Sequence, residues 1–407
     1  MAVLAGDHQR SGNPVMNLAG LVLEFAVASY ARLATVIGAL ILSAYVMISA
    51  ASVLIQPQAN WDMLPYIAVS GEATYPNAKS LHDFAYGAVR DGVNAANYDA
   101  LTTGDEFRQH MAGVPEDFVS LLGMYRVKIL YGKVLGALSH LLSPVDAVHT
   151  VSIASTLAFG LFTLLWLNAL RAMALAPFVV AVMIMAGFGD AARVGTPDML
   201  CAALFLGGLY AYVRKHEALT AVLLFLAFLA RPDNIIFATL FALFLVAARQ
   251  RSIGALAAFA GSFVSYFAVS HYAGHPGWWP HLYFSTIHQQ FNMTGFHPDF
   301  SAAAYLTAFA KSAYLSLEFN SWVGVALLAL GLWFVTHHAG FKLAKREGIA
   351  FLALSLSLAA KFVVFPIHDT RVYFPALIPL FLILLPVLQT YARSAAANAF
   401  NTGKTIS

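Results

Sequence analysis

The sequence has few charged residues and a single cysteine, and each shortage excludes a class of protein. Only 11% of the 407 residues are Asp, Glu, Lys or Arg, whereas a soluble domain carries about 25%. The net charge is +3 and no stripe of Lys and Arg occurs, which argues against a nucleic-acid partner. Because Cys201 is the only cysteine, intrachain disulfides are excluded.

Sequence motifs of common enzymes and metal sites are also missing. The chain has no paired Cys-x-x-Cys set, no His-Glu-x-x-His, no Gly-x-Ser-x-Gly and no Walker loop. The histidines are scattered without metal-ligand spacing. We therefore predict no metal ligands and no cofactor. The acidic part of the chain could bind a divalent cation, but no dense Asp/Glu cluster indicates one.

Hydrophobic residues are abundant, at 60% of the chain, and the mean hydropathy is +0.71. Continuous apolar runs of about 14–23 residues repeat along it. A run that crosses lipid must satisfy its own backbone hydrogen bonds, so these runs predict helices. The predicted fold is all-α, a polytopic transmembrane bundle of about ten spans. The predicted spans are residues 33–55, 147–170, 174–188, 198–213, 217–230, 234–248, 252–273, 319–337, 348–366 and 372–392.

Basic residues predict the orientation, since Lys and Arg collect in cytoplasmic loops. With the N-terminus inside, the inner loops contain Arg171, Arg214, Lys215, Arg249, Arg251, Lys342, Lys345 and Arg346. Residues 126–142 mix Arg126, Lys128 and Lys133 with apolar residues, which predicts an amphipathic helix lying flat in the interface. A span at 126–142 would move the short basic loops outside. We therefore predict a multi-pass protein of the inner (plasma) membrane.

The same pattern predicts the domain organisation. Residues 1–32 form a cytoplasmic N-terminal segment with an interfacial helix, residues 33–392 the transmembrane domain, and residues 393–407 a cytoplasmic tail. Within the domain, residues 56–146 form an extracytoplasmic segment with amphipathic juxtamembrane helices, and residues 274–318 form a second one. Polar residues gather on this side, which predicts an active site facing the periplasm or exterior.

Asp62 is the first charged residue after the first span. It opens a polar segment, Gln56 to Tyr125, that holds nine of the twenty acidic residues. A carboxylate at the boundary of water and lipid can act as general base toward an acceptor hydroxyl. The alternative is a solvated acid that marks the end of a span, with Trp61 in an interfacial aromatic belt.

Two arginines interrupt apolar segments in the later part of the chain. Arg231 precedes Pro232, which breaks the helix. An ionisable residue at such a place is a functional hypothesis, and a guanidinium suits a phosphate. The alternative for Arg231 is a local pair with Asp233. Arg371 lies in the turn before the last span, with His368 and Asp369 as polar partners, and Lys361 lies in the span before it. The alternative is an outer-turn charge cluster.

Further candidates follow from the remaining outer segments. Arg193 is another candidate phosphate ligand. Asp198 begins a span, and its alternative role is a cap at a helix N-terminus. In the loop 274–318, the Trp278-Trp279 pair and histidines such as His288 could line a sugar or prenyl groove. Their alternative role is anchoring to the interface.

Together these motifs resemble the integral-membrane glycosyltransferases of the GT-C superfamily. An Asp follows the first span (Trp61-Asp62), and the outer segment ends in an amphipathic helix that opens Tyr125-Arg126. Thr196-Pro197-Asp198-Met199-Leu200 enters a span. Arg231-Pro232-Asp233-Asn234 and Arg371-Val372-Tyr373-Phe374-Pro375 resemble short motifs of the family. The resemblance covers most of residues 30–392.

The resemblance implies a core of about seven helices with juxtamembrane helices above it, and inverting transfer from a polyprenyl-phosphate sugar. It implies that Asp62 activates the acceptor and that Arg231, Arg371 and Arg193 bind the donor phosphate. The remaining candidates for substrate contact are Tyr66, Arg126, Asp198, Asp233, His288, Lys361, His368 and Asp369. Many relatives carry a second acidic residue beside this Asp; Asp62 has none, which weakens the case for a metal.

The leading hypothesis is thus a glycosyltransferase. Its partners are a polyprenyl-phosphate-linked sugar, a lipid or glycan acceptor, and membrane lipids. A lipid or solute transporter or flippase is the alternative, and a scaffold or a ligase of envelope polymers is a third. Convergence of Asp62, Arg231 and Arg371 on one volume would favour the enzyme.

Overall fold

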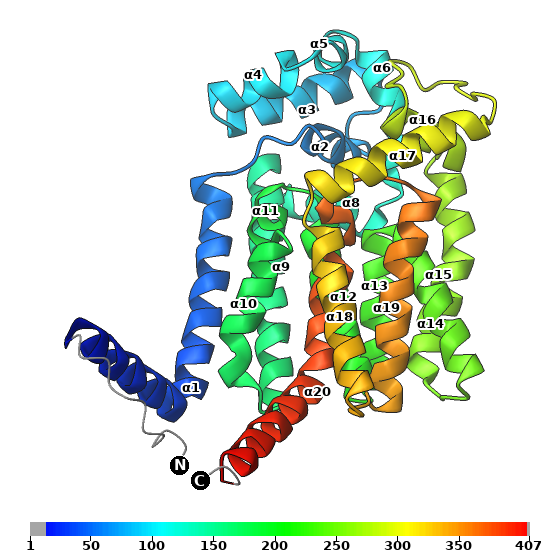
Figure 1. Cartoon of the computed structure of the whole chain (residues 1–407). Helices are drawn as coiled ribbons and strands as arrows, with labels where there is room; N and C mark the ends of the chain where they lie inside the picture. The colour runs from blue at the N-terminus through cyan, green and yellow to red at the C-terminus, as the bar shows by residue number, and fades with distance from the viewer. Residues whose placement is uncertain (1–13, 405–407) are drawn as a thin grey trace.

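The computed structural model describes residues 14–404 of the chain. These residues form α-helices and two short 3-10 helices, and no strand occurs among them. The predicted all-α fold is confirmed. The helices are arranged in two parts, a bundle of roughly upright helices and a layer of shorter helices that lies across its upper end (Figure 1).

The upright bundle contains the ten segments predicted as spans, and every one of them is helical (Figure 1). Apolar runs lack partners for their backbone groups in lipid, so a helix is the conformation that satisfies them. The helices are α1 (Pro14–Ile55), α9 (Pro144–Ala169), α10 (Ala176–Met185), α12 (Pro197–Val213), α13 (Glu217–Ala230), α14 (Ile235–Ala247), α15 (Ile253–Tyr272), α18 (Trp322–His338), α19 (Lys345–Val364) and α20 (Thr370–Lys404).

Length and composition support fewer crossings than ten. Within residues 14–404, five helices are long and apolar enough to cross a membrane: Leu33–Ile55, Pro144–Ala169, Ile253–Tyr272, Lys345–Val364 and Thr370–Ala395. A sixth is reached if α18 and the preceding α17 (Ala302–Glu318), bent by 72°, count as one broken span. The helices α10, α12, α13 and α14 are apolar but shorter. These features indicate a membrane-embedded helical protein.

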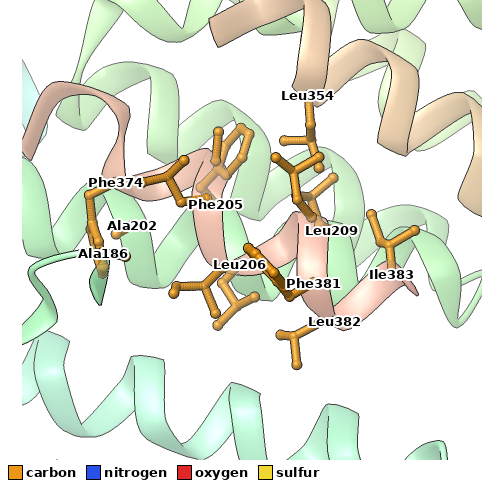
Figure 2. Packing of buried hydrophobic residues seen from close by; sticks show 14 of the residues in the cluster. Ala186, Ala202, Phe205, Leu206, Leu209, Leu354, Phe374, Phe381, Leu382 and Ile383 are labelled. Atoms are coloured by element: carbon orange, nitrogen blue, oxygen red, sulfur yellow. The ribbon is translucent and has the colours of Figure 1, made fainter. Parts of the chain in front are cut away.

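The centre of the bundle is α20, which packs against α10, α12, α18 and α19. Its residues from Tyr373 to Leu385 are almost all buried. Phe374, Phe381 and Ile383 meet Leu206 of α12 and Leu354 of α19 in one apolar cluster (Figure 2). Such burial holds the N-terminus of α20, where Arg371 lies, at a defined place beneath the upper layer.

The polar segment after α1 folds into the first half of the upper layer. Its helices are α2 (Met63–Gly71), α3 (Ala78–Gly92), α4 (Ala95–Thr103), α5 (Glu106–Gly113), α6 (Pro115–Ser120) and α7 (Gly123–Arg126). Asn77, Asn94 and Asp105 begin helices by accepting a hydrogen bond from a backbone N–H. The layer has its own apolar core, which includes Trp61 and Phe118. The predicted outer segment is therefore a folded unit.

Residues 126–142 do not form the single helix that the sequence predicts. The chain turns at Lys128, whose backbone is non-helical, between α7 and α8 (Ile129–Leu138). The helix α8 packs against α2, α9 and α13, so it joins the upper layer to the bundle. The break places Lys128 over the bundle end.

The second outer segment completes the upper layer with α16 (Trp278–Thr286) and α17. It is tied to the first segment, because Asn292 donates to Asp117 and the Met293 N–H donates to Ser120 Oγ at 2.9 Å. It also caps α19: the Trp278 indole and the Tyr305 hydroxyl donate to the Val364 and Val363 carbonyls at 2.7 and 2.5 Å. Carbonyls that a helix end leaves unpaired are thereby satisfied.

Three turns at the opposite end of the bundle share one construction. Arg171, Lys215 and Arg249 each adopt a left-handed backbone after a helix, with φ of 52°, 61° and 50°. In each case the next N–H bonds back into the last helical turn, as in a Schellman motif. A basic side chain there also complements the negative end of the helix dipole. These are the loops that the sequence predicts to be cytoplasmic.

Two helices continue past the predicted ends of the transmembrane domain, although the apolar spans within them are Leu33–Ile55 and Thr370–Ala395. The N-terminal segment 1–32 and the first span are joined, because α1 runs unbroken from Pro14 to Ile55; residues 1–13 lie outside the described part. The tail 393–407 is likewise continuous with the last span, as α20 extends to Lys404. The alanine-rich sequence after Arg393 favours a helix over a coil.

Candidate functional site

Asp62 lies at the junction of the upper layer and the bundle. It immediately precedes α2, and its carboxylate has a partner on each side. Oδ1 accepts a hydrogen bond of 3.0 Å from the Tyr125 hydroxyl. Oδ2 lies 3.2 Å from Nη2 of Arg371. The first charged residue of the outer segment is thus paired with the first turn of the last helix.

Arg371 connects Asp62 to the bundle. Its Nε donates to Asp369 Oδ2 at 2.6 Å, and its Nη1 lies 4.0 Å from Asp198 Oδ2. Asp198 is in the first turn of α12 and also accepts a 2.5 Å hydrogen bond from Thr196. A carboxylate is favoured in the first turn by the helix dipole, but the ion pairs are its specific contacts.

Arg231 extends the series of ion pairs from Asp198. It pairs with Asp198 and, through Nε at 3.1 Å, with Asp233 Oδ1. Lys361 near the end of α19 lies 3.0 Å from Asp233 Oδ2 and donates to Asn234 Oδ1 at 3.4 Å. The local Arg231–Asp233 pair considered as an alternative is present, and it is part of a longer network. We call Asp62, Arg371, Asp369, Asp198, Arg231, Asp233 and Lys361 the ion-pair network.

Proline places several of these charges at helix ends. Pro197 is the first residue of α12, and Pro232 separates α13 from α14 through the 3-10 helix η2 (Pro232–Asn234). Proline has no N–H to donate, so it is tolerated at a helix start and interrupts a helix elsewhere. The ends of α12, α13, α19 and α20 that carry the network face the upper layer (Figure 1).

Exposure differs along the network. The side chains of Asp198, Lys361 and Arg231 are 4%, 9% and 16% exposed, whereas Arg371 and Asp62 are 24% and 27% exposed. A buried charge is stable only when it is paired, and each of these side chains has an ion-pair partner. Asp233 and Asp369 are also partly exposed, at 32% and 40%, so a substrate can approach the network at these two carboxylates as well as at Asp62 and Arg371.

Aromatic hydroxyls surround Asp62. The Tyr66 and Tyr125 rings meet edge to face at 5.1 Å, and Tyr66 also meets Tyr131. Burial raises the pKa of the Tyr66 and Tyr125 hydroxyls, and the nearby Asp62 carboxylate raises both further. Both phenols therefore stay protonated, and Tyr125 remains a hydrogen-bond donor to Asp62.

Lys128 adds a cation from the upper layer. Its Nζ donates to the Met124 carbonyl at 2.6 Å and lies 5.4 Å from the centre of the Tyr125 ring. Burial, together with the charges of Arg231 and Arg371, lowers the pKa of Lys128 to about 8, against the opposite effect of Asp62 and Asp233. This lysine can change its charge near neutral pH.

A histidine pair lies beside Lys128. His275 Nδ1 accepts from the Gly277 N–H at 3.1 Å, so the proton of a neutral His275 is on Nε2, which donates to His281 Nδ1 at 3.0 Å. Burial and the Lys128 charge lower the pKa of His275 to about 4 and that of His281 well below its usual value. Both rings are neutral at pH 7, and His281 keeps an N–H on Nε2.

The structure brings together eight of the predicted site residues and separates four. Asp62, Tyr66, Asp198, Arg231, Asp233, Lys361, Asp369 and Arg371 meet at the network. Arg193 instead pairs with Asp190 at 2.6 Å, and Arg126 pairs with Glu72 at 2.6 Å. His288 lies in an outer cleft beside α5, and His368 is exposed. Arg193 is therefore not placed with the other two arginines.

Sequence reasoning missed Lys128 and His275 as site residues. It pointed to Tyr125 only through the Tyr125-Arg126 motif and to His281 only among the aromatic and histidine residues of the loop 274–318. Lys128 lies two residues after Arg126, but a predicted helix through residues 126–142 assigned it no special position. His275 and His281 are six residues apart with no motif. Only the folding of two distant outer segments against each other brings these side chains to Asp62.

The described part of the chain contains no cluster of metal ligands, and the sequence has no significant match among known proteins. Among residues 14–404, no group of three or more His, Cys, Asp and Glu side chains is arranged to hold a metal ion. The sequence matches no protein-family model, no curated protein and no solved structure at a significant level.

Proposed function

We propose that the chain is a membrane glycosyltransferase of GT-C type. It moves a sugar from a polyprenyl-phosphate donor to a lipid or glycan acceptor, with inversion, on the extracytoplasmic side of the plasma membrane. One observation carries the proposal: Asp62 of the outer segment and Arg371 and Arg231 of the bundle lie in a single ion-pair network at the upper end of the bundle.

The reaction needs a base, a positioned acceptor and a stabilised leaving group. Asp62 takes the proton from the acceptor hydroxyl, whose oxygen attacks the anomeric carbon of the sugar. The bond from that carbon to the phosphate oxygen breaks on the opposite face, which inverts the centre. The polyprenyl phosphate leaves with the bonding electrons, and Arg371 and Arg231 stabilise its charge.

The membrane arrangement is part of the same proposal. The short helices α10, α12, α13 and α14 run alongside the five long apolar helices (Figure 1). We propose that all ten cross, with local thinning of the bilayer where the helices are short. The basic turns at Arg171, Lys215 and Arg249 then face the cytoplasm, and the ion-pair network faces the periplasm or exterior.

Replacement of Asp62 tests the proposal. The Asp62→Asn variant keeps the size and the hydrogen bond to Tyr125 but cannot accept a proton as a base. We expect transfer of radiolabelled sugar from polyprenyl-phosphate-linked donors, in vesicles containing the purified protein, to fall by about 10²–10⁴-fold. Asp190→Asn is a matched control, since Asp190 also pairs with an arginine at an outer turn but lies outside the network. Full activity of Asp62→Asn would remove Asp62 from the mechanism.

A lipid transporter or flippase is the second candidate. The observation in its favour is Lys361, a nearly buried cation of α19 that contacts Asp233 and Asn234 inside the bundle end. A transporter moves its lipid across the vesicle membrane and forms no new glycosidic bond. Mass spectrometry of the vesicle lipids after incubation separates the two candidates, because only the enzyme yields glycosylated acceptor and free polyprenyl phosphate.

A further inference from the structure

A concave site lies in the upper layer, away from the ion-pair network. It is a cleft of about 480 Å³ between the start of α5 and the end of α16. The cleft is lined by Asp105, Glu106, Phe107, Phe284, Ser285, Thr286, Ile287, His288, Gln289 and Phe291. Its size is within the range of about 300–1,000 Å³ that is usual for small-molecule sites.

Aromatic rings form the floor of this outer cleft. Phe107 is buried and packs against Phe284 edge to face at 5.7 Å and against Phe291 at 6.3 Å. Phe291 also stacks on His110, with ring centres 4.1 Å apart and the rings nearly parallel. The floor is therefore apolar and fixed by packing.

Polar groups form the rim of the cleft. Glu106, Ser285, His288 and Gln289 are exposed, and within residues 14–404 their side chains make no hydrogen bond. Asp105, by contrast, is occupied by Arg108 at the start of α5. The rim offers a carboxylate, a hydroxyl, an imidazole and an amide to a ligand, and none of these groups must first leave a protein partner.

The lining selects the chemistry of the ligand. No Lys or Arg lines the cleft, and two carboxylates do, so a phosphate or other anion is disfavoured. The mixture of donors and acceptors around an aromatic floor disfavours a prenyl chain, which would leave the polar rim without partners. A neutral, polyhydroxylated molecule satisfies both parts, with hydroxyls at the rim and C–H faces on the floor.

The cleft is one aromatic layer away from Asp62. Phe107 of its floor packs edge to face on Trp61 at 5.2 Å, and Trp61 directly precedes Asp62. Trp61 also packs on Tyr125, which donates to Asp62. We propose that the outer cleft binds an oligosaccharide, the carbohydrate part of the acceptor that lies away from the reacting hydroxyl. The assignment as acceptor subsite rests on the proposed function; the binding of a carbohydrate does not.

Substitutions on the rim test the subsite without disturbing the core. The variants are Glu106→Gln and the double substitution His288→Ala with Gln289→Ala, with Glu116→Gln as the matched control on exposed α6, outside the cleft. The probe is a panel of fluorescently labelled di- to tetrasaccharides released from cell-envelope glycans, titrated against the whole protein in nanodiscs. We expect at least one probe to bind and the rim double variant to weaken it about 10-fold or more, while Glu116→Gln binds as the wild type does.

The kinetic arm distinguishes the two proposals. With an acceptor that carries the bound oligosaccharide, the rim double variant should raise the acceptor KM about 10-fold and leave kcat unchanged, because remote contacts hold substrate and transition state alike. Asp62→Asn should keep glycan binding and lose transfer. If no probe binds, or if the rim variants bind as tightly as the wild type, the proposal that the cleft binds an oligosaccharide is wrong. Glycan binding without transfer from any polyprenyl-phosphate donor sinks the proposed function and leaves the cleft in place.

Discussion

Lys128 is a residue of the upper layer whose pKa is shifted toward neutral pH. In the folded protein its pKa is lowered to about 8, chiefly by burial, whereas in the unfolded chain it is near 10.4. Below pH 8 the folded state holds a buried charge at a cost. Between pH 8 and 10.4 the unfolded state binds more protons than the folded one, so this residue makes stability rise with pH.

Replacement of Lys128 tests this linkage. We expect the rise in Tm contributed between pH 8 and 10 to be lost in Lys128→Met, which has no titratable group, and in Lys128→Arg, which stays charged throughout. Intrinsic-fluorescence melting of the detergent-solubilised protein across pH 7–10 measures the difference from the wild type. Parallel pH profiles for the three proteins would mean that Lys128 keeps an ordinary pKa.

At the residue scale the sequence predicts charges better than it predicts their partners. Asp62, Arg231 and Arg371 are recognisable because each interrupts apolar sequence, where a charge is costly unless it is paired. Arg193 satisfies the same criterion, yet it forms an ion pair with Asp190, one helical turn before it. No property of the sequence distinguishes these cases, because a local carboxylate is available to Arg193, Arg231 and Arg371 alike.

In the upper layer, α7 lies very close to the backbone of another segment at Gly123. A Cβ at Gly123 would stand 2.2 Å from the Gly274 carbonyl oxygen and 3.0 Å from its carbon. Backbone atoms cannot move aside as a flexible side chain can. Gly123→Ala would therefore separate α7 from the segment that contains His275 and His281. This segment lies beside Lys128.

We expect Gly123→Ala to destabilise the protein by about 1–3 kcal/mol through overpacking. Gly87→Ala in α3 is the control, because a Cβ there meets nothing within 4 Å. It should be neutral or stabilising by about 0.5–1 kcal/mol through helix propensity. Thermal unfolding of both variants measures the effect, and a Gly123→Ala protein as stable as Gly87→Ala would contradict the close contact.

The elements of the bundle are predictable and those of the upper layer much less so. Apolar runs predict eight of the ten bundle helices to within three residues at each end, because lipid leaves a backbone few alternatives. The exceptions are α1, which begins well before residue 33, and α20, which continues well beyond residue 392. In the upper layer, water can satisfy the backbone, so boundaries depend on caps such as Asn77 and Asp105. The split of residues 126–142 at Lys128 depends on tertiary contacts of α8 with three other helices.

On the scale of the whole molecule, cysteine labelling measures which end of the bundle faces the cytoplasm. Glu116 lies in the upper layer, and Lys342 lies in the turn between α18 and α19 at the opposite end; both are exposed. Cys201 is fully buried, so the natural chain gives no thiol background. We expect a membrane-impermeant maleimide to label Glu116→Cys on intact cells and Lys342→Cys only after permeabilisation. The reverse pattern would place Asp62 in the cytoplasm.

The meeting of Asp62, Asp198 and Arg371 is likewise a property of the whole molecule. These residues come from the start, the middle and the end of the chain. Asp62 adjoins the apolar core of the upper layer, whereas Asp198 and Arg371 begin helices that share the core of the bundle. Sequence can nominate the three as costly charges, but their distances follow from how α12 and α20 pack beneath the upper layer. The outer cleft similarly needs α5 and α16, which are far apart in sequence.

Positive and negative side chains alternate along the ion-pair network, and this affects the order in which donor and acceptor bind. Four carboxylates and three cations leave the network with one net negative charge, and each of its cations is paired with a carboxylate. An incoming phosphate must compete with a resident aspartate for the same guanidinium. A phosphate that pairs with Arg371 releases the Asp62 carboxylate from that guanidinium. Asp62 can then accept the proton of the acceptor hydroxyl, whose oxygen attacks the bound donor. The proposed mechanism therefore favours donor binding before acceptor binding.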